Sequence, residues 1–147
     1  MPVSRERVLA ADPDEVWRLV ADPHRLPAWW PGVTRVEEAT QESWTTVMMS
    51  GKGKAVRADY TRAEADEPHR LVWRQELAAT PFERLLAEAA TEITLSPDGG
   101  GTRVRISLVQ RPRGWARFAP FQLRVAARRQ VLGALDGLER LFAEETR

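Results

Sequence analysis

The residue types that most often carry out catalysis are few in this sequence and are not grouped. Histidine is the commonest acid–base and metal-binding side chain, and the chain has two, His24 directly after Pro23 and His69 directly after Pro68. Both are expected at the surface, because each lies at the end of an expected element. No histidine or carboxylate has the spacing of a metal site, and cysteine is absent. We therefore expect no metal, no cofactor, no disulfide and no cysteine nucleophile.

Paired carboxylates are a second route to acid–base catalysis. Glu76 and Glu92 fall on the same side of their expected strands as Arg74 and Arg105, which predicts ion pairs on the outer face of a sheet. Exposed pairs of this kind contribute about 0–1 kcal/mol each, so we interpret these carboxylates as structural. Asp59 is also expected to point outward, since it alternates with the apolar residues of its strand.

The expected inner side of the strands is apolar and carries a few polar groups. The polar residues are Tyr60, Gln75, Thr91 and Gln110. By alternation along the strands, they are expected on the same side of the sheet as Leu71, Trp73, Leu77, Ile93 and Leu108. An apolar lining with a few convergent polar atoms is typical of a small-molecule pocket. It is also typical of a core whose hydroxyls are hydrogen-bonded. On the residues alone, both interpretations stay open.

The chain has six tryptophans, and large rigid aromatic side chains serve both as core residues and as ligand contacts. Three of them, Trp17, Trp29 and Trp30, are expected to pack in the core. The other three, Trp44, Trp73 and Trp115, are the candidates for the wall or mouth of a pocket. For any one tryptophan, core packing is the stronger expectation.

Two arginines lie where an apolar residue is expected. Arg124 and Arg128 are four residues apart and share a helix face with Leu135 and Phe142. Charges on such a face must reach solvent, pair, or meet an anion. One interpretation is that this part of the helix extends beyond the sheet. The other is that both arginines bind a ligand carboxylate or phenolate at a pocket entrance, unless Glu83 pairs with them.

Cap and turn signals define the elements that must position these residues. Asp12-Pro13-Asp14-Glu15 offers a cap, a first-turn proline and a capping-box glutamate, and predicts a helix that ends at Asp22-Pro23. The other expected elements are a strand over Val3–Ala10, a short helix over His24–Trp30, strands over Val33–Glu38, Ser43–Ser50, Lys54–Ala65, Arg70–Leu77, Thr91–Ser96 and Arg103–Gln110, and a helix over about Pro120–Ala143.

Short strands separated by turn residues predict an antiparallel meander. Its clearest turn is the glycine-rich run from Pro97 to Gly101. The last helix is expected to pack on the sheet through a broad apolar face, which consists of Val125, Val131, Leu132, Leu135, Leu138, Leu141 and Phe142. No repeat or linker interrupts the pattern, so we expect one α+β domain over residues 1–147.

Charge and hydropathy exclude several classes of protein. Lys and Arg number 22 against 21 Asp and Glu, and the two signs are interleaved, so we expect no nucleic-acid binding. The charged first residues do not resemble a signal peptide. No run approaches the ~18 apolar residues of a membrane span, and the expected location is the cytoplasm. The sequence carries no signal for the oligomeric state.

The stretch from Ala11 to Val33 reads A-D-P-D-E-V-W-R-L-V-A-D-P-H-R-L-P-A-W-W-P-G-V. It resembles the opening of START-like (SRPBCC, polyketide cyclase/dehydrase-like) proteins, in which a P-x-E-V-W helix precedes a D-P…L-P-x-W-x-P-G-V helix. The expected order of elements agrees with that family over essentially the whole chain. The resemblance implies a helix-grip fold, in which a curved antiparallel sheet of six or seven strands wraps around a long C-terminal helix and leaves a cavity between them.

The resemblance favours the pocket interpretation, with a cavity of at least about 300 Å³ as in most small-molecule sites. The candidate ligand-binding residues are Trp44, Tyr60, Trp73, Gln75, Leu108, Arg124 and Arg128. We expect a carrier or sensor of a small hydrophobic ligand, which is aromatic, polyketide-like or lipid-like. A polyketide cyclase or dehydratase that acts by positioning is the alternative. A third hypothesis is an interaction module in the manner of the Hsp90 activators, which requires a large exposed apolar patch.

Overall fold

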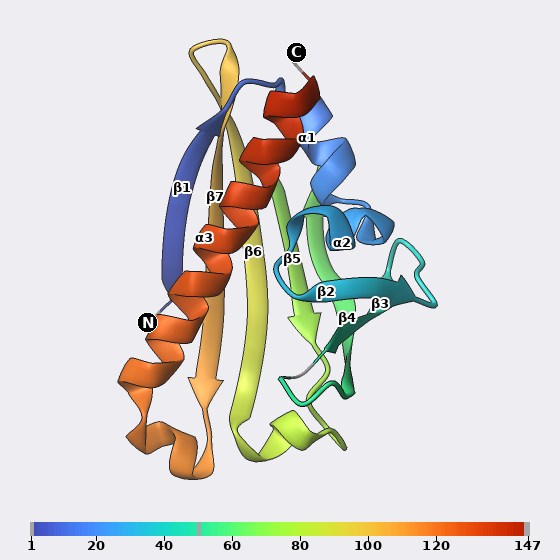
Figure 1. Ribbon diagram of the computed structural model, residues 1–147. Coiled ribbons are helices and arrows are strands. Elements are labelled where there is room, and N and C mark those ends of the chain that lie inside the picture. Colours follow the sequence, from blue (N-terminus) through green and yellow to red (C-terminus); the bar gives the residue numbers. More distant parts are fainter. Residues whose placement is uncertain (1, 50, 146–147) are drawn as a thin grey trace.

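The computed structural model describes residues 2–49 and 51–145, which form a curved seven-stranded antiparallel sheet with a long helix across its inner face (Figure 1). The strands are β1 (Val3–Leu9), β2 (Val33–Glu37), β3 (Ser43–Met49), β4 (Ala55–Asp66), β5 (Arg70–Gln75), β6 (Leu86–Asp98) and β7 (Gly101–Pro112). They are ordered β1-β7-β6-β5-β4-β3-β2. Each neighbouring pair is antiparallel. The expected α+β fold and strand count are confirmed.

Three α-helices and three 3₁₀ turns complete the described chain. They are α1 (Pro13–Val20), η1 (Pro23–Arg25), α2 (Leu26–Trp29), η2 (Pro81–Arg84), η3 (Gly114–Phe118) and α3 (Pro120–Glu145). Val131, Leu135 and Leu138 of α3 are fully buried against the sheet residues Val104 and Ile106, which are equally inaccessible. Each such side chain stabilises the fold by about 1.5–3 kcal/mol, so α3 is fixed on the sheet.

Several expected boundaries need correction. Asp12 is the N-cap residue of α1, but its side chain makes no cap hydrogen bond. The helix expected over His24–Trp30 is divided into η1 and α2, since Pro27 supplies no amide hydrogen for a continuous helix. β6 and β7 extend beyond the expected ranges Thr91–Ser96 and Arg103–Gln110. The start of β6 was not predicted, because its alanine-rich first residues show no alternation of apolar and polar side chains. Ser50, expected at a strand end, lies outside the described residues.

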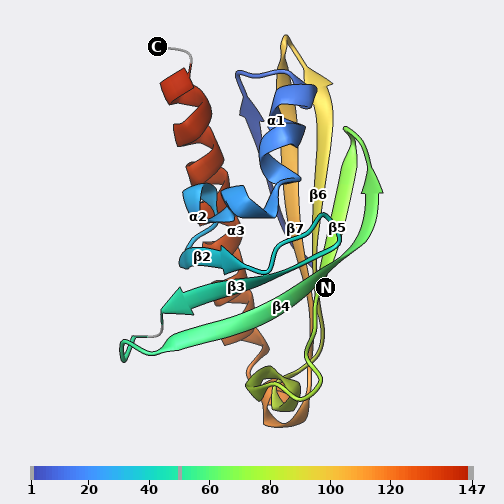
Figure 2. The ribbon, with the colours of Figure 1, turned by 90° about the vertical axis from the view of Figure 1, so that its right-hand side faces the viewer.

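The sheet is strongly bent along β4. Its pairing with β5 shifts register between Arg62 and Glu64, and the pairing of β2 with β3 shifts between Val33 and Arg35. Such bulges increase the local twist of a strand pair. Figure 2 shows the result, in which β2, β3 and β4 run steeply across the direction of β5, β6 and β7. The bent part of the sheet therefore forms a wall that faces α3.

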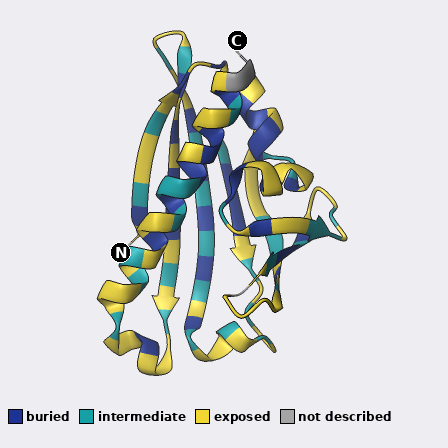
Figure 3. Cartoon of the chain, in the orientation of Figure 1, coloured by how far each residue is buried: buried dark blue, intermediate teal, exposed yellow. Residues whose placement is uncertain are grey.

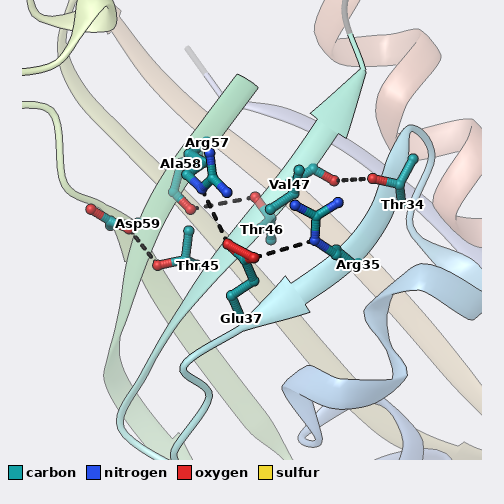
Figure 4. A network of polar contacts seen from close by, with 9 residues as sticks. All are labelled: Thr34, Arg35, Glu37, Thr45, Thr46, Val47, Arg57, Ala58 and Asp59. Atoms are coloured by element: carbon teal, nitrogen blue, oxygen red, sulfur yellow. Dashed lines mark hydrogen bonds and ion pairs between the residues drawn. The ribbon is translucent and has the colours of Figure 1, made fainter. Parts of the chain in front are cut away.

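Polar contacts on the side away from α3 hold β2, β3 and β4 together (Figure 4). Glu37 accepts hydrogen bonds from Arg57 Nε at 3.1 Å and Arg35 Nε at 3.2 Å. The hydrogen bond from Arg57, followed by that from Arg35, is the main reason why the pKa of Glu37 lies below its ordinary value. The Thr34 hydroxyl donates to the Val47 carbonyl at 2.8 Å. The inner side of these strands remains available for the cavity.

Two glycines let α2 approach α3 closely. A Cβ atom on Gly137 would lie 2.3 Å from the Trp29 carbonyl oxygen, and one on Gly133 would lie 2.7 Å from Pro31 Cγ. Real Cβ atoms do not approach other atoms so closely, so these positions require glycine. The contact fixes the segment from Trp29 to Pro31 over the inner face of the sheet, and thereby positions Trp30.

Candidate ligand-binding cavity

A cavity of about 190 Å³ lies between the inner face of the sheet, α2 and the middle of α3. Its described lining consists of Leu26, Trp30, Val33, Trp44, Thr46, Met48, Tyr60, Trp73, Gln75, Phe82, Leu86, Ala89, Ala90, Thr91, Leu108, Gln110 and Gln130. These residues come from the two short connecting elements α2 and η2 as well as from β2 to β7 and α3. The cavity is therefore the space that the curled sheet leaves beneath the helix.

Strand register explains why residues far apart in sequence meet here. Tyr60 is opposite Trp44 on one side and Gln75 on the other. In the next row, Thr91 is opposite Trp73 and Leu108. Directly opposed residues in neighbouring strands have Cβ atoms about 4.5–5.5 Å apart on one face. Two cross-strand rows thus make up the wall of the cavity.

Aromatic rings form one end of the cavity. Trp44 stacks on Tyr60 with ring centroids 6.0 Å apart and an interplanar angle of 13°. Trp73 meets Trp44 edge to face at 5.7 Å and Trp30 at 5.8 Å. Pairs of this geometry contribute about 0.5–1.5 kcal/mol beyond the area they bury. The rings therefore hold one another in place and present a rigid apolar surface.

The polar groups that line the cavity are neutral. They are two threonines, Thr46 and Thr91, three glutamines, Gln75, Gln110 and Gln130, and Tyr60. Burial raises the pKa of Tyr60 to about 12, and a hydrogen bond with Thr46 opposes part of that rise. Tyr60 consequently keeps its proton at neutral pH and can donate a hydrogen bond. Amides and hydroxyls both donate and accept, so the lining suits hydroxyl and carbonyl groups.

No acid or base that titrates near neutral pH lines this cavity among the described residues. Tyr60 is the one ionisable side chain in the described lining. General acid–base catalysis is most effective when the pKa of the catalytic group lies near the working pH. The lining can therefore bind, orient and exclude water, and a reaction in it would depend on positioning.

The volume of the cavity is smaller than expected. At about 190 Å³ it falls below the roughly 300–1,000 Å³ of most ligand pockets. It is somewhat larger than a cavity of about 150 Å³ that accommodates benzene. The cavity as it stands has room for a ligand of about one ring.

A second hollow of about 270 Å³ adjoins the cavity and shares Leu108 and Gln110 with it. Its other described lining residues are Val3, Pro112, Pro120, Leu123, Arg124 and Ala127. It lies beneath the first turns of α3, next to the end of β7. The two spaces together follow the inner face of α3, and the shared residues separate them.

Five of the seven predicted site residues meet in the cavity, namely Trp44, Tyr60, Trp73, Gln75 and Leu108. Arg124 lines the adjoining hollow instead. Arg128 lines neither space; with Arg129 and Asp136 it borders a shallow groove on the flank of α3. The separation follows from helix geometry, because residues four apart are rotated by about 40°. The Glu83 carboxylate, the expected partner of both arginines, accepts a hydrogen bond from the Ala79 amide at 3.2 Å.

Sequence reasoning missed several residues of the lining, among them Trp30, Phe82 and Gln130, and misplaced one candidate. Trp30, expected as a packing residue, is buried and also lines the cavity. Phe82 and Gln130 line it from η2 and α3, and alternation along strands could not identify residues on those elements. Trp115, a candidate for the wall or mouth, is 69% exposed on η3. Gln130 could have been identified from the sequence, because the helix wheel of α3 places it beside the apolar face of that helix.

The histidines lie away from the cavity. His24 and His69 are both exposed, and His24 Nδ1 lies 3.2 Å from Asp22 Oδ1. Within residues 2–49 and 51–145, no three His, Asp or Glu side chains are grouped in a way that could hold a metal ion. In the same described part of the chain, no helix combines the length and apolar character needed to cross a bilayer.

Comparison with known families gives a match over nearly the whole chain. The sequence model of the family described as polyketide cyclase/dehydrase and lipid transport matches residues 2–143. The chain belongs to this family. Its helix-grip architecture and the START-like opening from Ala11 to Val33 are those of a START-like (SRPBCC) protein, as the sequence predicted. A search of curated proteins returns no match.

Solved structures show the same fold. The di-domain ARO/CYC protein StfQ from the steffimycin biosynthetic pathway has a TM-score of 0.78 at 17% identity, over 99% of this chain and 51% of StfQ. The chain thus spans about half of that protein's length. TTHA0849 from Thermus thermophilus has a TM-score of 0.78 at 23% identity, and each chain is fully covered. Ara h 8.0201 has a TM-score of 0.74 at 13% identity over 98% of both chains.

Proposed function

We propose that this polyketide cyclase/dehydrase and lipid transport family member binds a small, neutral, predominantly aromatic ligand in the cavity, as a carrier or sensor. The observation that supports this most strongly is the composition of the described lining, which combines four large aromatic rings around one end with hydroxyls and amides and contains no side chain charged at neutral pH. An unpaired ionised group would lose its hydration without compensation in such a site.

Each ligand-binding residue has a proposed role. Trp44, Trp73 and Tyr60 offer ring faces and edges, on which an aromatic ligand can stack. Leu108 supplies apolar contact from β7, and the Gln75 amide donates or accepts a hydrogen bond opposite Tyr60. A phenolic hydroxyl or a ketone oxygen is the group that this set can satisfy. Arg128 is left out of the proposed site, because it lies on another flank of α3.

An enzyme of the cyclase or dehydratase type is the second candidate. The family description and the similarity in fold to StfQ support it. The protonated Tyr60 hydroxyl beside Thr46 would be the donor to a substrate carbonyl. In that case the cavity would act by restricting the conformations of a reactive chain.

Filling the cavity tests the binding proposal. Ala89 is buried and lies opposite Gln110 on the inner face of β6, so Ala89→Trp places an indole in the cavity. Calorimetric titration with 4-ethylphenol should give a Kd of about 1 mM or lower for the wild type, and about a ten-fold or greater loss for the variant. Ala63→Trp, at an exposed position of β4, is the matched control and should bind normally. Equal affinity of wild type and Ala89→Trp would refute binding in this cavity.

A further inference from the structure

One end of the molecule carries three exposed aromatic side chains close together in sequence. Trp115 is 69% exposed, Phe118 82% and Phe121 72%. They lie on η3 and at the start of α3, at the lower end of the molecule in Figure 1, where Figure 3 shows mostly exposed residues. The other large apolar residues that are exposed in the described chain occur singly. Exposed aromatic residues gathered in this way mark an interaction surface.

The same segment is strongly basic. Residues 111–129 contain six arginines and no aspartate or glutamate, whereas the whole chain has a net charge of only +1. The arginines are Arg111, Arg113, Arg117, Arg124, Arg128 and Arg129. Arg111 pairs with Glu88 at 3.6 Å, and the positive excess that remains attracts a surface of the opposite sign over about 8–10 Å at physiological ionic strength. We call residues 111–129 the basic aromatic tip.

Contacts within the tip hold its aromatic side chains outward. Ala116 is the buried residue of η3, so this turn attaches to the body through a methyl group and not through its rings. Arg113 donates to the Glu83 carbonyl and Arg117 to the Gly114 carbonyl, each at 3.3 Å. The Arg117 guanidinium also lies 5.8 Å from the centre of the Phe118 ring. The exposure of the rings is therefore part of the folded arrangement.

We propose that the basic aromatic tip docks on the surface of an anionic lipid bilayer. Tryptophan and phenylalanine enter the boundary between headgroups and acyl chains, and arginines beside them are attracted to lipid phosphates. The three rings are exposed and belong to η3 and the first turn of α3, elements that lie at the end of the molecule (Figure 2). This placement suits insertion into a soft surface better than fit to a shaped protein groove. Such docking is peripheral and requires no spanning helix.

The basic aromatic tip lies next to the hollow that adjoins the cavity, so docking would affect how a ligand reaches it. The lining of the hollow that adjoins the cavity includes Pro112, Pro120, Leu123 and Arg124, all of which belong to the tip. Docking would bring this hollow next to the bilayer, where apolar ligands accumulate. Docking of the tip requires only its exposed rings and its positive charge, and does not depend on which ligand the cavity binds.

Vesicle flotation tests the proposal without any cavity ligand. The full chain is mixed with vesicles of phosphatidylcholine, or of phosphatidylcholine with about 30% phosphatidylserine. We expect binding to the anionic vesicles about ten-fold or more above that to the neutral ones. The variant Trp115→Ala/Phe118→Ala/Phe121→Ala should lose about ten-fold in binding to anionic vesicles. Thermal unfolding of the variant verifies that it folds, and Val8→Ala/Met49→Ala, at exposed apolar positions elsewhere, should bind as the wild type does.

Charge reversal provides the second comparison. Arg113→Glu/Arg117→Glu should abolish binding to anionic vesicles, whereas Arg25→Glu/Arg140→Glu, which changes the net charge equally at exposed sites outside the tip, should retain most of it. The proposal is overturned if the wild type binds neither kind of vesicle. In that case an acidic protein would be the remaining partner for the tip. The proposal is equally overturned if the tip variants and the control variants bind alike.

Discussion

Tyr60 shows how the surroundings of one residue set the chemistry of the cavity. It is the single tyrosine of the chain, it stacks on Trp44, and burial keeps its hydroxyl protonated far above neutral pH. A phenol that stays neutral donates a hydrogen bond and adds no charge. The cavity thus gains directional binding while its interior remains uncharged.

The ionisation of Tyr60 can be measured directly, because no other tyrosine contributes to the signal. Burial raises the pKa of Tyr60 to about 12, against about 10 for a solvated tyrosine. Ultraviolet difference titration of the folded protein should therefore show little tyrosinate near pH 10. Since the folded-state pKa is raised, this residue's stabilising effect is complete below about pH 10 and is lost as the pH rises towards 12. Half-ionisation near the solvated value, in protein still folded by circular dichroism, would contradict the burial of this ring.

At the residue scale, alternation along strands, together with the START-like resemblance, predicted part of the cavity lining. It identified Trp44, Tyr60, Trp73, Gln75 and Leu108 as one inner set, and the structure places all five in the cavity lining. The residues contributed by connecting elements could not be found this way, because the position of a loop or short helix over a sheet depends on tertiary packing. Arg128 illustrates a related limit: it was assigned to the same helix face as Arg124, but the rotation of about 40° between the two residues puts it on the flank of α3.

At the scale of elements, the closeness of α2 and α3 determines the shape of the cavity. Gly133 and Gly137 are one helical turn apart in α3, and the segment of Trp29 to Pro31 packs onto them. Trp30, in the middle of this segment, reaches the aromatic end of the cavity, where the centre of its ring lies 5.8 Å from that of Trp73. The order of these elements was predictable from caps and prolines. Their close approach was not, because nothing local distinguishes these glycines from ordinary helix residues.

Substitution of Gly137 tests this close approach. In an exposed helix position, replacing glycine by alanine stabilises by about 0.8–1 kcal/mol. In Gly137→Ala the new methyl group would lie 2.3 Å from the Trp29 carbonyl oxygen, so we expect a loss of about 1–3 kcal/mol in the free energy of unfolding. Urea denaturation measures the change. The reverse substitution Ala126→Gly, at an exposed position of the same helix, should cost about 1 kcal/mol through helix propensity alone. A stabilised Gly137→Ala protein would show that the two helices do not touch there.

At the scale of the whole molecule, one curved sheet serves two separate surfaces. The bend along β4 creates the cavity (Figure 2), while the junction of β7 and α3 carries the basic aromatic tip. The fold class and the order of elements along the chain follow from turn signals and from the START-like opening of the sequence. The degree of curvature does not, because it depends on bulges whose positions are set by pairing between strands. The expected cavity volume of at least about 300 Å³ came from the usual size of small-molecule sites, and the cavity is smaller, at about 190 Å³.

The most direct test of the binding proposal compares two ligands that share a 4-ethylphenyl group and differ in charge. Wild-type protein is titrated calorimetrically near neutral pH with 4-ethylphenol, which is neutral, and with 4-ethylbenzoate, which is ionised. Because no charged side chain lines the described cavity, we predict that the benzoate binds about ten-fold or more weakly than the phenol. Equal or tighter binding of the benzoate would mean that a cation such as Arg124 governs recognition, and would contradict a neutral aromatic ligand for this cavity.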